Sequence, residues 1–320
     1  MKRGDGSHAI SNNMALIKVE IVAPVHNRRD ETLQCLRSLA RADTTGIKLH
    51  IIIVDDGSTD GTAEAVSTEF PDVEIVRGDG NLWYTAGTNR GIEAALKHAP
   101  DYILAINNDS IFDQNSIARL LACAEEHPRS VVGALLIDRD TPHRIFQVSP
   151  QWGLLYGGFR HWYKQTVWTV PTKPWRVELI VGNCVLYPVL AIKESGLMDE
   201  RRLAQFGDAE YTPRMKKKSW NLLIEPRARV FCKPNDVVSG FMQRSMRQKI
   251  QLLFLPTSPY SIQRRVWGNI GGAPNKTLGV LSIPIFILRT LLGCSYESSW
   301  ALTQDEEPLA QLFSSAVINE

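Results

Sequence analysis

The sequence predicts an α/β fold, an open sheet flanked by helices, because strand-like and helix-like segments alternate over the first ~130 residues. Residues 49–54, LHIIIV, form an apolar run typical of a parallel strand that is covered on both faces. Residues 29–40 carry Leu33, Leu36 and Leu39 at the spacing of a helix. Polar clusters follow three of the predicted strands directly, which indicates where a ligand site would form.

The remaining elements follow in order along the chain. The pattern predicts strands at residues 19–25, 49–54, 73–76 and 102–106, and helices at residues 29–40, 62–70 and 85–98. After residue 132 the alternation weakens, and residues 146–175, rich in Gly, Trp and Pro, are expected to form irregular loops. Short strands are predicted again at residues 183–187, 220–224 and 229–231.

The composition is that of an ordinary globular protein. The 320 residues are 44% hydrophobic and 22% charged, which is enough to bury a full core. Lys and Arg total 36 against 34 Asp and Glu, so the net charge of +2 gives no reason to expect nucleic acid as a partner. The five cysteines show no metal-ligand spacing, which favours a reducing, cytoplasmic location.

Three parts are expected along the chain. Residues 1–14 are mostly polar and lack the apolar stretch of a secretory signal, so we expect a flexible leader there. A single domain is expected over residues 15–240, and a helical extension over residues 241–320. The longest apolar run, 278–294, is broken by Pro284 and Arg289 and is shorter than the ~20 residues of a membrane span.

The C-terminal extension has an uneven charge. Between Asp236 and Glu297 lie seven basic residues and no acidic one, whereas the tail after Tyr296 is acidic, without Lys or Arg. Residues 241–254 interleave basic side chains with apolar ones at helical spacing, namely Met242, Met246, Ile250 and Leu253. Three interpretations stay open: residues 241–292 rest on an anionic membrane surface, pack on the main domain, or join copies into a homo-oligomer.

A ligand site is expected at the ends of the predicted strands. Polar clusters stand there at residues 24–27 (PVHN), 55–58 (DDGS) and 107–109 (NND). In open α/β sheets ligands bind at the carboxyl ends of the strands. No G-x-G-x-x-G follows the first strand, and no G-x-x-x-x-G-K-[ST] is present. These absences from the sequence argue against a dehydrogenase and against an ATPase.

Five motifs resemble, in order and separation, those of family 2 glycosyltransferases of the GT-A fold. They are VEIVAPVHN, IIIVDDGSTDGT, GNLWYTAGTNRGI, ILAINNDS and FGDAEYTPRMKKKSW. Within that family the sequence is similar to bacterial rhamnosyl- and galactofuranosyl-type transferases. The resemblance implies a GT-A domain over residues 15–240, a Rossmann-like open mixed sheet, that transfers a sugar from a nucleotide-sugar donor.

The resemblance assigns Pro24, His26 and Asn27 to the nucleotide. It also implies that Asp56 accepts a hydrogen bond from the imino N–H of uracil or thymine, an edge that some purines lack. A tight turn before the next helix explains part of the same pattern. It leaves the adjacent Asp55 and Asp56 carboxylates unexplained, because their repulsion would cost free energy unless a ligand uses one of them.

Asn107, Asn108 and Asp109 stand where the family carries its Asp-x-Asp motif. The resemblance implies that the two Asn residues contact the donor and that Asp109 is the anionic ligand of Mg²⁺ or Mn²⁺. Such a cation would act as a Lewis acid on the leaving diphosphate. Many relatives have a His ligand where this chain has Cys232. Because Cys prefers softer metals, the cation is expected to be weakly held or to arrive with the donor.

Asp208, in FGDAEY, is the expected catalytic base. In similar enzymes the matching Asp takes the acceptor proton during in-line attack, which inverts the anomeric configuration. Burial near the sugar should raise its pKa, and Glu210 is the second candidate. Both acids also suit the start of a helix, and the two functions are compatible. The resemblance further assigns Asn89, Arg90 and Asn183 to the donor.

Aromatic residues gather in the loop-like stretch 146–175. They are Trp152, Tyr156, Trp162, Tyr163, Trp168 and Trp175. Aromatic faces stack on sugar rings, so this stretch is expected either to bind the acceptor or to form a hydrophobic lid.

Together these features predict an inverting glycosyltransferase of bacterial surface polysaccharide synthesis. The favoured donor is dTDP-rhamnose, with a UDP-hexose as the alternative, and the acceptor is a saccharide or a lipid-linked sugar at the inner membrane face. A sugar-1-phosphate nucleotidyltransferase fits less well, because PVHNRRD lacks the glycines of that first loop. A non-catalytic scaffold is the other alternative. Asn107, Gly207 and Cys232 favour it, and the presence of Asp109 and Asp208 opposes it.

Overall fold

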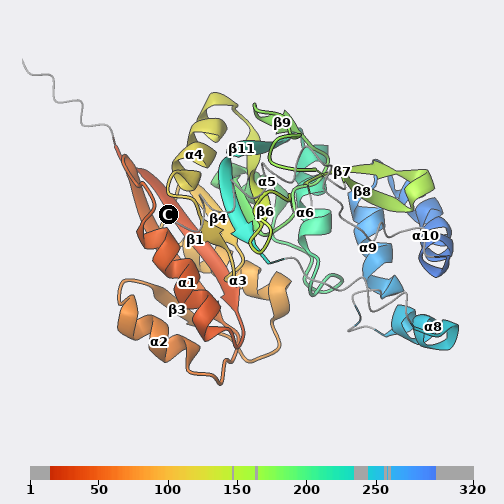
Figure 1. The fold of residues 1–320 in the computed structure, drawn as a ribbon, viewed down its shortest axis with the longest axis horizontal. Helices are drawn as coiled ribbons and strands as arrows, with labels where there is room; N and C mark the ends of the chain where they lie inside the picture. Colours follow the sequence, from red (N-terminus) through yellow and green to blue (C-terminus); the bar gives the residue numbers. More distant parts are fainter. Residues whose placement is uncertain are drawn as a thin grey trace, which may run out of the picture.

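A computed structural model describes residues 15–145, 148–162, 165–233, 244–255, 258 and 261–292. A nine-stranded mixed sheet in the order β3-β2-β1-β4-β10-β6-β11-β5, with β9 paired to β11, forms its centre (Figure 1). The strands are β1 Ile17–Val25, β2 Ile47–Asp55, β3 Glu74–Arg77, β4 Tyr102–Ile106, β5 Ile111–Phe112, β6 Ser130–Asp138, β9 Trp175–Arg176, β10 Cys184–Pro188 and β11 Asn221–Cys232. This confirms the predicted open sheet and shows that it is mixed.

Parallel pairing brings the ends of several strands to one edge of the sheet. Strands β3, β2, β1 and β4 are mutually parallel, as are β6 and β11, whereas β10 runs antiparallel between β4 and β6. The carboxyl ends of β1, β2 and β4 therefore meet, with Val25 opposite Asp55 in the register. The start of β10 joins them because Cys184 lies opposite Ile106.

Helices cover both faces of the sheet (Figure 1). They are α1 Arg29–Ala40, α2 Thr62–Glu69, α3 Trp83–Leu96, α4 Ser116–Glu126, α5 Val189–Ser195 and α6 Asp208–Lys217. Alternate residues of β1 enter two separate cores: Ile21 packs with the buried face of α1, and Val22 packs with Ile92 of α3. This two-sided burial explains why the strands have few polar residues.

The sequence pattern located the first half of the fold and missed part of the second. Helix α1 begins and ends as predicted, and β4 also has the predicted bounds. Helix α4 and strand β6 were not predicted. The two short strands expected at residues 220–231 are one strand, β11, whose pairing with β6 is interrupted by a bulge between Glu225 and Arg229.

Residues 146–175 do not form only the predicted irregular loops. Strands β7 Val148–Gly153 and β8 Gly158–Trp162 make a hairpin around the short helix η1 Leu154–Tyr156. This hairpin packs against the C-terminal helices α9 Ile262–Gly272 and α10 Lys276–Leu291. The Asn269 side chain donates to the Gly157 carbonyl at 2.7 Å, and Gly157 approaches the Phe286 backbone so closely that a Cβ would not fit.

The C-terminal helices continue from the main sheet toward one end of the molecule (Figure 1). Helix α8 Met246–Phe254 begins with a capping box between Ser245 and Gln248, and α9 packs on α6. Among the described residues, no helix combines the length and apolar character that crossing a membrane requires. The predicted leader, the boundary at residue 240 and the acidic tail lie outside the described residues.

Candidate active site

Two loops at the carboxyl edge of the sheet are tied together by His26 and Asn27. The His26 Nδ1 atom lies 2.6 Å from the Asp56 carbonyl oxygen, so Nδ1 carries the proton, and Nε2 accepts from the Asn27 amide at 3.0 Å. The Asn27 backbone N–H donates to the Ser58 hydroxyl, and its side-chain oxygen accepts from the Thr59 N–H. Both predicted nucleotide residues thus lie on the surface beside the second polar cluster.

Protein groups, not a ligand, satisfy the adjacent carboxylates Asp55 and Asp56. Asp55 is fully buried and forms a 2.7 Å ion pair with Arg77. The Asp56 carboxylate accepts three backbone N–H bonds, from Gly80, Leu82 and Trp83, at 2.8, 2.9 and 3.1 Å. The fold therefore supplies a partner to each carboxylate, so their proximity alone does not require a ligand; the assignment of Asp56 to the base stays a prediction.

The loop held by Asp56 presents an aromatic residue at the site. Trp83 has a positive φ of 58°, a backbone conformation that costs free energy for a side chain of this size. Its indole is 47% exposed, whereas the next residue, Tyr84, points inward and donates its hydroxyl to the Gly182 carbonyl at 3.0 Å. One of the two aromatics therefore belongs to the interior, and the other lies on the surface.

Asp109 lies at the same edge with one satisfied oxygen and one unsatisfied oxygen. Its Oδ2 atom accepts from the Arg28 guanidinium at 2.8 Å. Its Oδ1 atom is buried without a hydrogen-bond partner among the described residues. A buried carboxylate oxygen without a partner is costly, and a hard divalent cation is a ligand that would satisfy it. The donor set thus fits Mg²⁺ or Mn²⁺, with Asp109 as the residue that would hold the ion.

The two Asn residues before Asp109 have different surroundings. The Asn107 backbone N–H donates to the Asn183 carbonyl at 3.0 Å, and the Asn107 side chain is half-buried. Asn108 is buried and donates its amide to the Thr32 hydroxyl of α1 at 2.9 Å. Its assignment to the donor was wrong in this structure, because the side chain points into the protein and anchors the loop.

Cys232 is a buried thiol beside Ser110, 3.6 Å from that hydroxyl. Burial raises the pKa of the Cys232 thiol to about 12, so it stays protonated at neutral pH. Its soft sulfur is also a poor match for Mg²⁺, which takes oxygen ligands.

Asp208 is the first residue of α6 and is held by a neighbouring backbone. Its Oδ2 atom accepts from the Gly182 N–H at 2.9 Å. Burial raises the pKa of the Asp208 carboxyl above its ordinary value, and hydrogen bonds from backbone N–H groups oppose that rise. The predicted direction of the shift is confirmed. Such a shift makes a carboxylate a better proton acceptor near neutral pH.

The dipeptide Gly182–Asn183 connects the two acidic residues. The Gly182 N–H binds Asp208, and the Asn183 carbonyl accepts from Asn107, two residues before Asp109. Gly182 has no room for a side chain, because a Cβ would lie 2.1 Å from the Tyr84 hydroxyl. The start of β10 therefore fixes Asp208 and the Asp109 loop relative to one another.

Glu210, the second candidate base, lies two residues after Asp208 in α6. Its Oε1 atom is 2.9 Å from the Arg214 Nε atom, and its side chain packs under Gly271 of α9. Burial raises the pKa of Glu210 as well, and the nearby Arg214 opposes that rise. The ion pair and the cover by α9 favour a structural role for this residue.

Asn89 and Arg90 were assigned to the donor; the structure buries the Asn89 side chain in protein contacts, whereas the assignment of the exposed Arg90 stays a prediction. Asn89 is 1% exposed; its amide donates to the Met198 carbonyl and to Glu200, and its oxygen accepts from the Met198 N–H. It therefore anchors the 198–200 loop and cannot reach a ligand. Arg90 lies on the exposed face of α3, 3.1 Å from Glu93. Pro24 is half-buried beneath Gly87 of α3.

Sequence analysis missed Arg28 as a partner of Asp109, and it missed the hydrogen bond between Tyr84 and Gly182. Arg28 belongs to the PVHNRRD segment and directly follows two assigned residues, so its position could have drawn attention. The positions of Tyr84 and Gly182 depend on a contact between residues 98 apart in sequence. No local pattern reports such a contact.

The open mixed sheet, with Asp109 and Asp208 at the carboxyl ends of its strands, has the architecture of the GT-A class of glycosyltransferases. GalNAc-T7 solved with UDP, GalNAc and Mn²⁺ superimposes with a TM-score of 0.55 at 14% identity, covering 69% of this chain and 44% of that chain. Staphylococcus aureus TarS 1–349 gives a TM-score of 0.52 at 14% identity, covering 91% and 77%. At these identities the two likenesses establish the fold alone.

In sequence comparison, the model of glycosyl transferase family 2 matches residues 20–175. The N-acetylglucosaminyl-diphospho-decaprenol L-rhamnosyltransferase of Mycobacterium tuberculosis is 26% identical over 231 residues, which cover 66% of this chain and 74% of the relative. The poly(ribitol-phosphate) β-N-acetylglucosaminyltransferase TarS of Staphylococcus aureus is 26% identical over 188 residues, 54% of this chain and 30% of that one. Residues 20–175 therefore carry a glycosyl transferase family 2 domain.

Proposed function

We propose that the chain is an inverting glycosyltransferase that uses a pyrimidine nucleotide-sugar and contributes to a bacterial surface polysaccharide. The observation that carries this proposal is the connection through Gly182–Asn183, which holds a carboxylate of raised pKa and a carboxylate with an unpartnered oxygen at one edge of the sheet. A transferase needs both groups, one for the acceptor proton and one beside the leaving diphosphate.

In the proposed reaction, Asp208 accepts the proton of the acceptor hydroxyl as its oxygen attacks the anomeric carbon. The bond from that carbon to the diphosphate breaks on the opposite face, which inverts the configuration. Asp109 would hold Mg²⁺ or Mn²⁺, and that ion supplies Lewis-acid stabilisation to the departing diphosphate. The proposed nucleotide side comprises Pro24, His26 and Asn27, with Asp56 fixing the 80–83 loop beside them.

The proposed donor is dTDP-rhamnose, with a UDP-hexose as the alternative. The Mycobacterium tuberculosis relative is named as an L-rhamnosyltransferase, and its name includes N-acetylglucosaminyl-diphospho-decaprenol, a lipid-linked sugar. This chain is 26% identical to that relative over 231 residues. The similarity supports a rhamnose donor and a saccharide or lipid-linked acceptor for this chain.

A thermal-unfolding panel tests the donor site. The full chain is heated with TDP, UDP, GDP or ADP, each with Mg²⁺, Mn²⁺ or EDTA. A nucleotide at about 100 times its Kd should add ~2.7 kcal/mol of stability. We expect stabilisation by TDP or UDP that needs the cation and disappears in Asp109→Ala. Hydrolysis of dTDP-rhamnose then reports turnover. Nucleotide binding without hydrolysis would favour the alternative of a non-catalytic scaffold. The absence of stabilisation by any of the nucleotides would refute the donor site.

An anionic membrane surface is the proposed location of the acceptor, met from the cytoplasm by the C-terminal helices. Helix α8 leaves Met246, Ile250 and Phe254 exposed at successive helical turns, by 55%, 45% and 71%. Leu253, at the edge of this stripe, is buried. An apolar stripe flanked by basic residues such as the exposed Arg247 suits the headgroup region of anionic lipid.

Vesicle sedimentation tests this surface. We expect the full chain to sediment with phosphatidylglycerol vesicles and not with phosphatidylcholine vesicles. Phe254→Ser should weaken the binding about tenfold, since it removes the buried area of one large apolar side chain. Leu190→Ser, on α5 and 53% exposed, is the matched control and should change nothing. Loss of a dimer in Phe254→Ser, with no vesicle binding by the native chain, would assign the stripe to self-association instead.

A further inference from the structure

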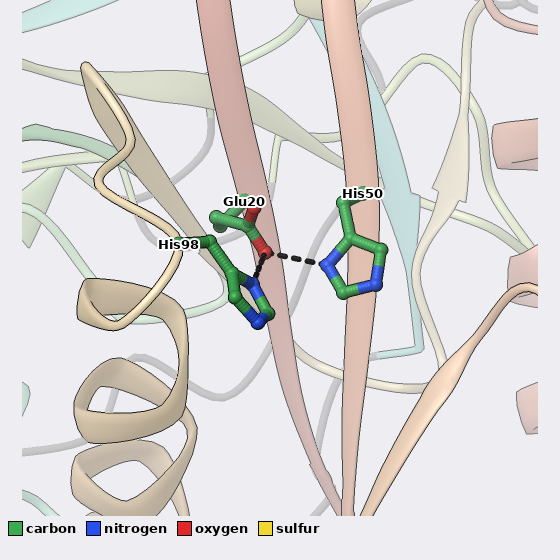
Figure 2. A group of neighbouring side chains, drawn as sticks. All are labelled: Glu20, His50 and His98. Carbon is green, nitrogen blue, oxygen red and sulfur yellow. Dashed lines mark hydrogen bonds and ion pairs between the residues drawn. The ribbon is translucent and has the colours of Figure 1, made fainter.

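A second group of metal-ligating side chains lies far from the candidate active site. Glu20 of β1, His50 of β2 and His98, just after α3, converge on one face of the sheet (Figure 2). Glu20 and His50 are direct partners in the β1–β2 register. Glu20 lies five residues before Val25, which at about 3.3 Å per residue puts the group roughly 16 Å from the candidate active-site edge.

The geometry centres on one carboxylate oxygen. The Glu20 Oε2 atom lies 2.7 Å from His50 Nδ1 and 3.1 Å from His98 Nδ1, so the carboxylate stands between the two rings (Figure 2). Glu20 is 6% exposed, an unusual burial for a glutamate. Each His side chain is about one-third exposed, 32% and 38%, so solvent reaches the group from the ring side.

These three side chains match the ligands of a zinc-class ion. One ligand atom from each lies within 4.8 Å of the other two, and no other group of three in the described part of the chain meets this condition. Tetrahedral bonds of about 2.1 Å separate neighbouring ligand atoms by about 3.4 Å, so small outward shifts would admit the ion. Imidazole nitrogens with one carboxylate suit Zn²⁺ better than Mg²⁺.

A fourth residue is positioned to orient one of the ligands. The His98 Nε2 atom lies 3.4 Å from the Glu74 carboxylate of β3. When Nδ1 binds a metal, the proton of a neutral His moves to Nε2, and that N–H would point at Glu74. Ligating histidines in metal sites commonly donate their second N–H to a carboxylate in this way.

We propose that Glu20, His50 and His98 form a binding site for a divalent transition-metal ion of the zinc class, separate from the cation held by Asp109. The ion links β1, β2 and the segment after α3, with Glu74 as the outer partner of His98 and water in the open position. Its role is to stabilise the half of the sheet that carries the nucleotide loops at its other end.

Metal binding to the full chain, stripped of metals beforehand, tests the proposal. We expect Zn²⁺ at 100 times its Kd to raise the melting temperature by roughly 5 °C, with Mg²⁺ giving no such rise. Co²⁺ should bind one equivalent and give the strong visible absorption of tetrahedral cobalt.

Variants separate this site from the others. His50→Gln and His98→Gln should abolish the cobalt spectrum, and Glu74→Gln should lower the affinity about 10–100-fold. His127→Gln, on a distant loop, and Asp109→Ala should leave the spectrum unchanged. Circular dichroism confirms that each variant is folded before titration. A cobalt spectrum that survives in both His variants, or the absence of any Zn²⁺ or Co²⁺ signal in the native chain, would overturn the proposal.

Discussion

The Arg28 guanidinium lies 2.8 Å from Oδ2 of Asp109, and the other oxygen of that carboxylate is buried without a partner among the described residues. Arg28 thus occupies one side of the group that is proposed to hold the divalent cation. Positive charge from the protein and from the metal compete for the same carboxylate.

Removing Arg28 should strengthen cation binding in the absence of nucleotide. Exposed ion pairs contribute ~0.2–1 kcal/mol, so we expect the Mn²⁺ dissociation constant of Arg28→Ala to fall about two- to fivefold. Titration followed by electron paramagnetic resonance measures it. Arg29→Ala, whose guanidinium pairs with Asp30, is the control and should bind Mn²⁺ as the native chain does. Weaker Mn²⁺ binding by Arg28→Ala would contradict competition at Asp109.

Replacing Asp208 should abolish turnover without unfolding the protein. General-base catalysis contributes ~10²–10⁴-fold, so kcat of Asp208→Asn should fall by that factor while nucleotide affinity is retained. Glu210→Gln tests the alternative base. Since Glu210 is paired with Arg214 and covered by α9, this variant should keep most of its activity. The opposite ranking of the two variants would move the base to Glu210.

The pH dependence follows from the raised pKa of Asp208. The base must be ionised to act, so kcat/KM should fall as the pH drops through this raised pKa, above the range of an ordinary Asp. Stability changes with pH in the opposite direction to kcat/KM. Because burial favours the protonated form, ionisation at higher pH destabilises the fold, and Asp208→Asn should be at least as stable as the native chain at neutral pH. Melting curves of the native chain and of Asp208→Asn measure the difference in stability. They are recorded between about pH 5 and 8, where proteins are usually most stable.

Asn89→Ala should destabilise the protein although the residue lies outside the ligand site. It would leave the Met198 N–H and carbonyl without partners, at a cost of ~2 kcal/mol in the free energy of unfolding. Arg90→Ala, the adjacent exposed residue, should change that free energy by less than ~0.5 kcal/mol. Urea unfolding compares the two. A loss of nucleotide affinity in folded Asn89→Ala with unchanged stability would restore its assignment to the donor.

Two glycines of α9 provide a matched pair for the contact with α6. A Cβ at Gly271 would lie 2.1 Å from Cγ of Glu210, whereas one at Gly268 meets only Ala209 Cβ at 3.8 Å. Gly271→Ala should therefore destabilise the protein by ~1–3 kcal/mol. Gly268→Ala should stabilise it slightly, since Ala is the better helix former. Equal effects of the two substitutions on thermal unfolding would mean that α9 does not pack on α6 as described.

Local pattern was sufficient for the elements whose burial is repetitive. The apolar run at residues 49–54 and the leucines of α1 have the periods of a buried strand and an amphipathic helix, and both elements were located. The β7–β8 hairpin was missed because its contact with Asn269 joins residues 112 apart. Strand β6 and helix α4 show that the parallel sheet continues beyond the predicted alternation.

The candidate site was predicted in part for the same reason. Asp109 and Asp208 stand in motifs, and the structure brings their loops together through Gly182. Asn89 and Asn108 stand in motifs too, but their partners are buried groups at distant positions, Met198 and Thr32. Residue type identifies a polar group in the correct region. Only the packing around it decides whether that group faces a ligand or the interior.

The three backbone N–H bonds to Asp56 have a thermodynamic consequence. Together with the contacts of His26 and Asn27, they connect the loops that follow β1, β2 and β3 into one hydrogen-bonded unit. The conformational entropy of these loops is therefore lost when the chain folds. A nucleotide that binds there meets a preorganised backbone, so little of its binding free energy is spent on ordering the protein.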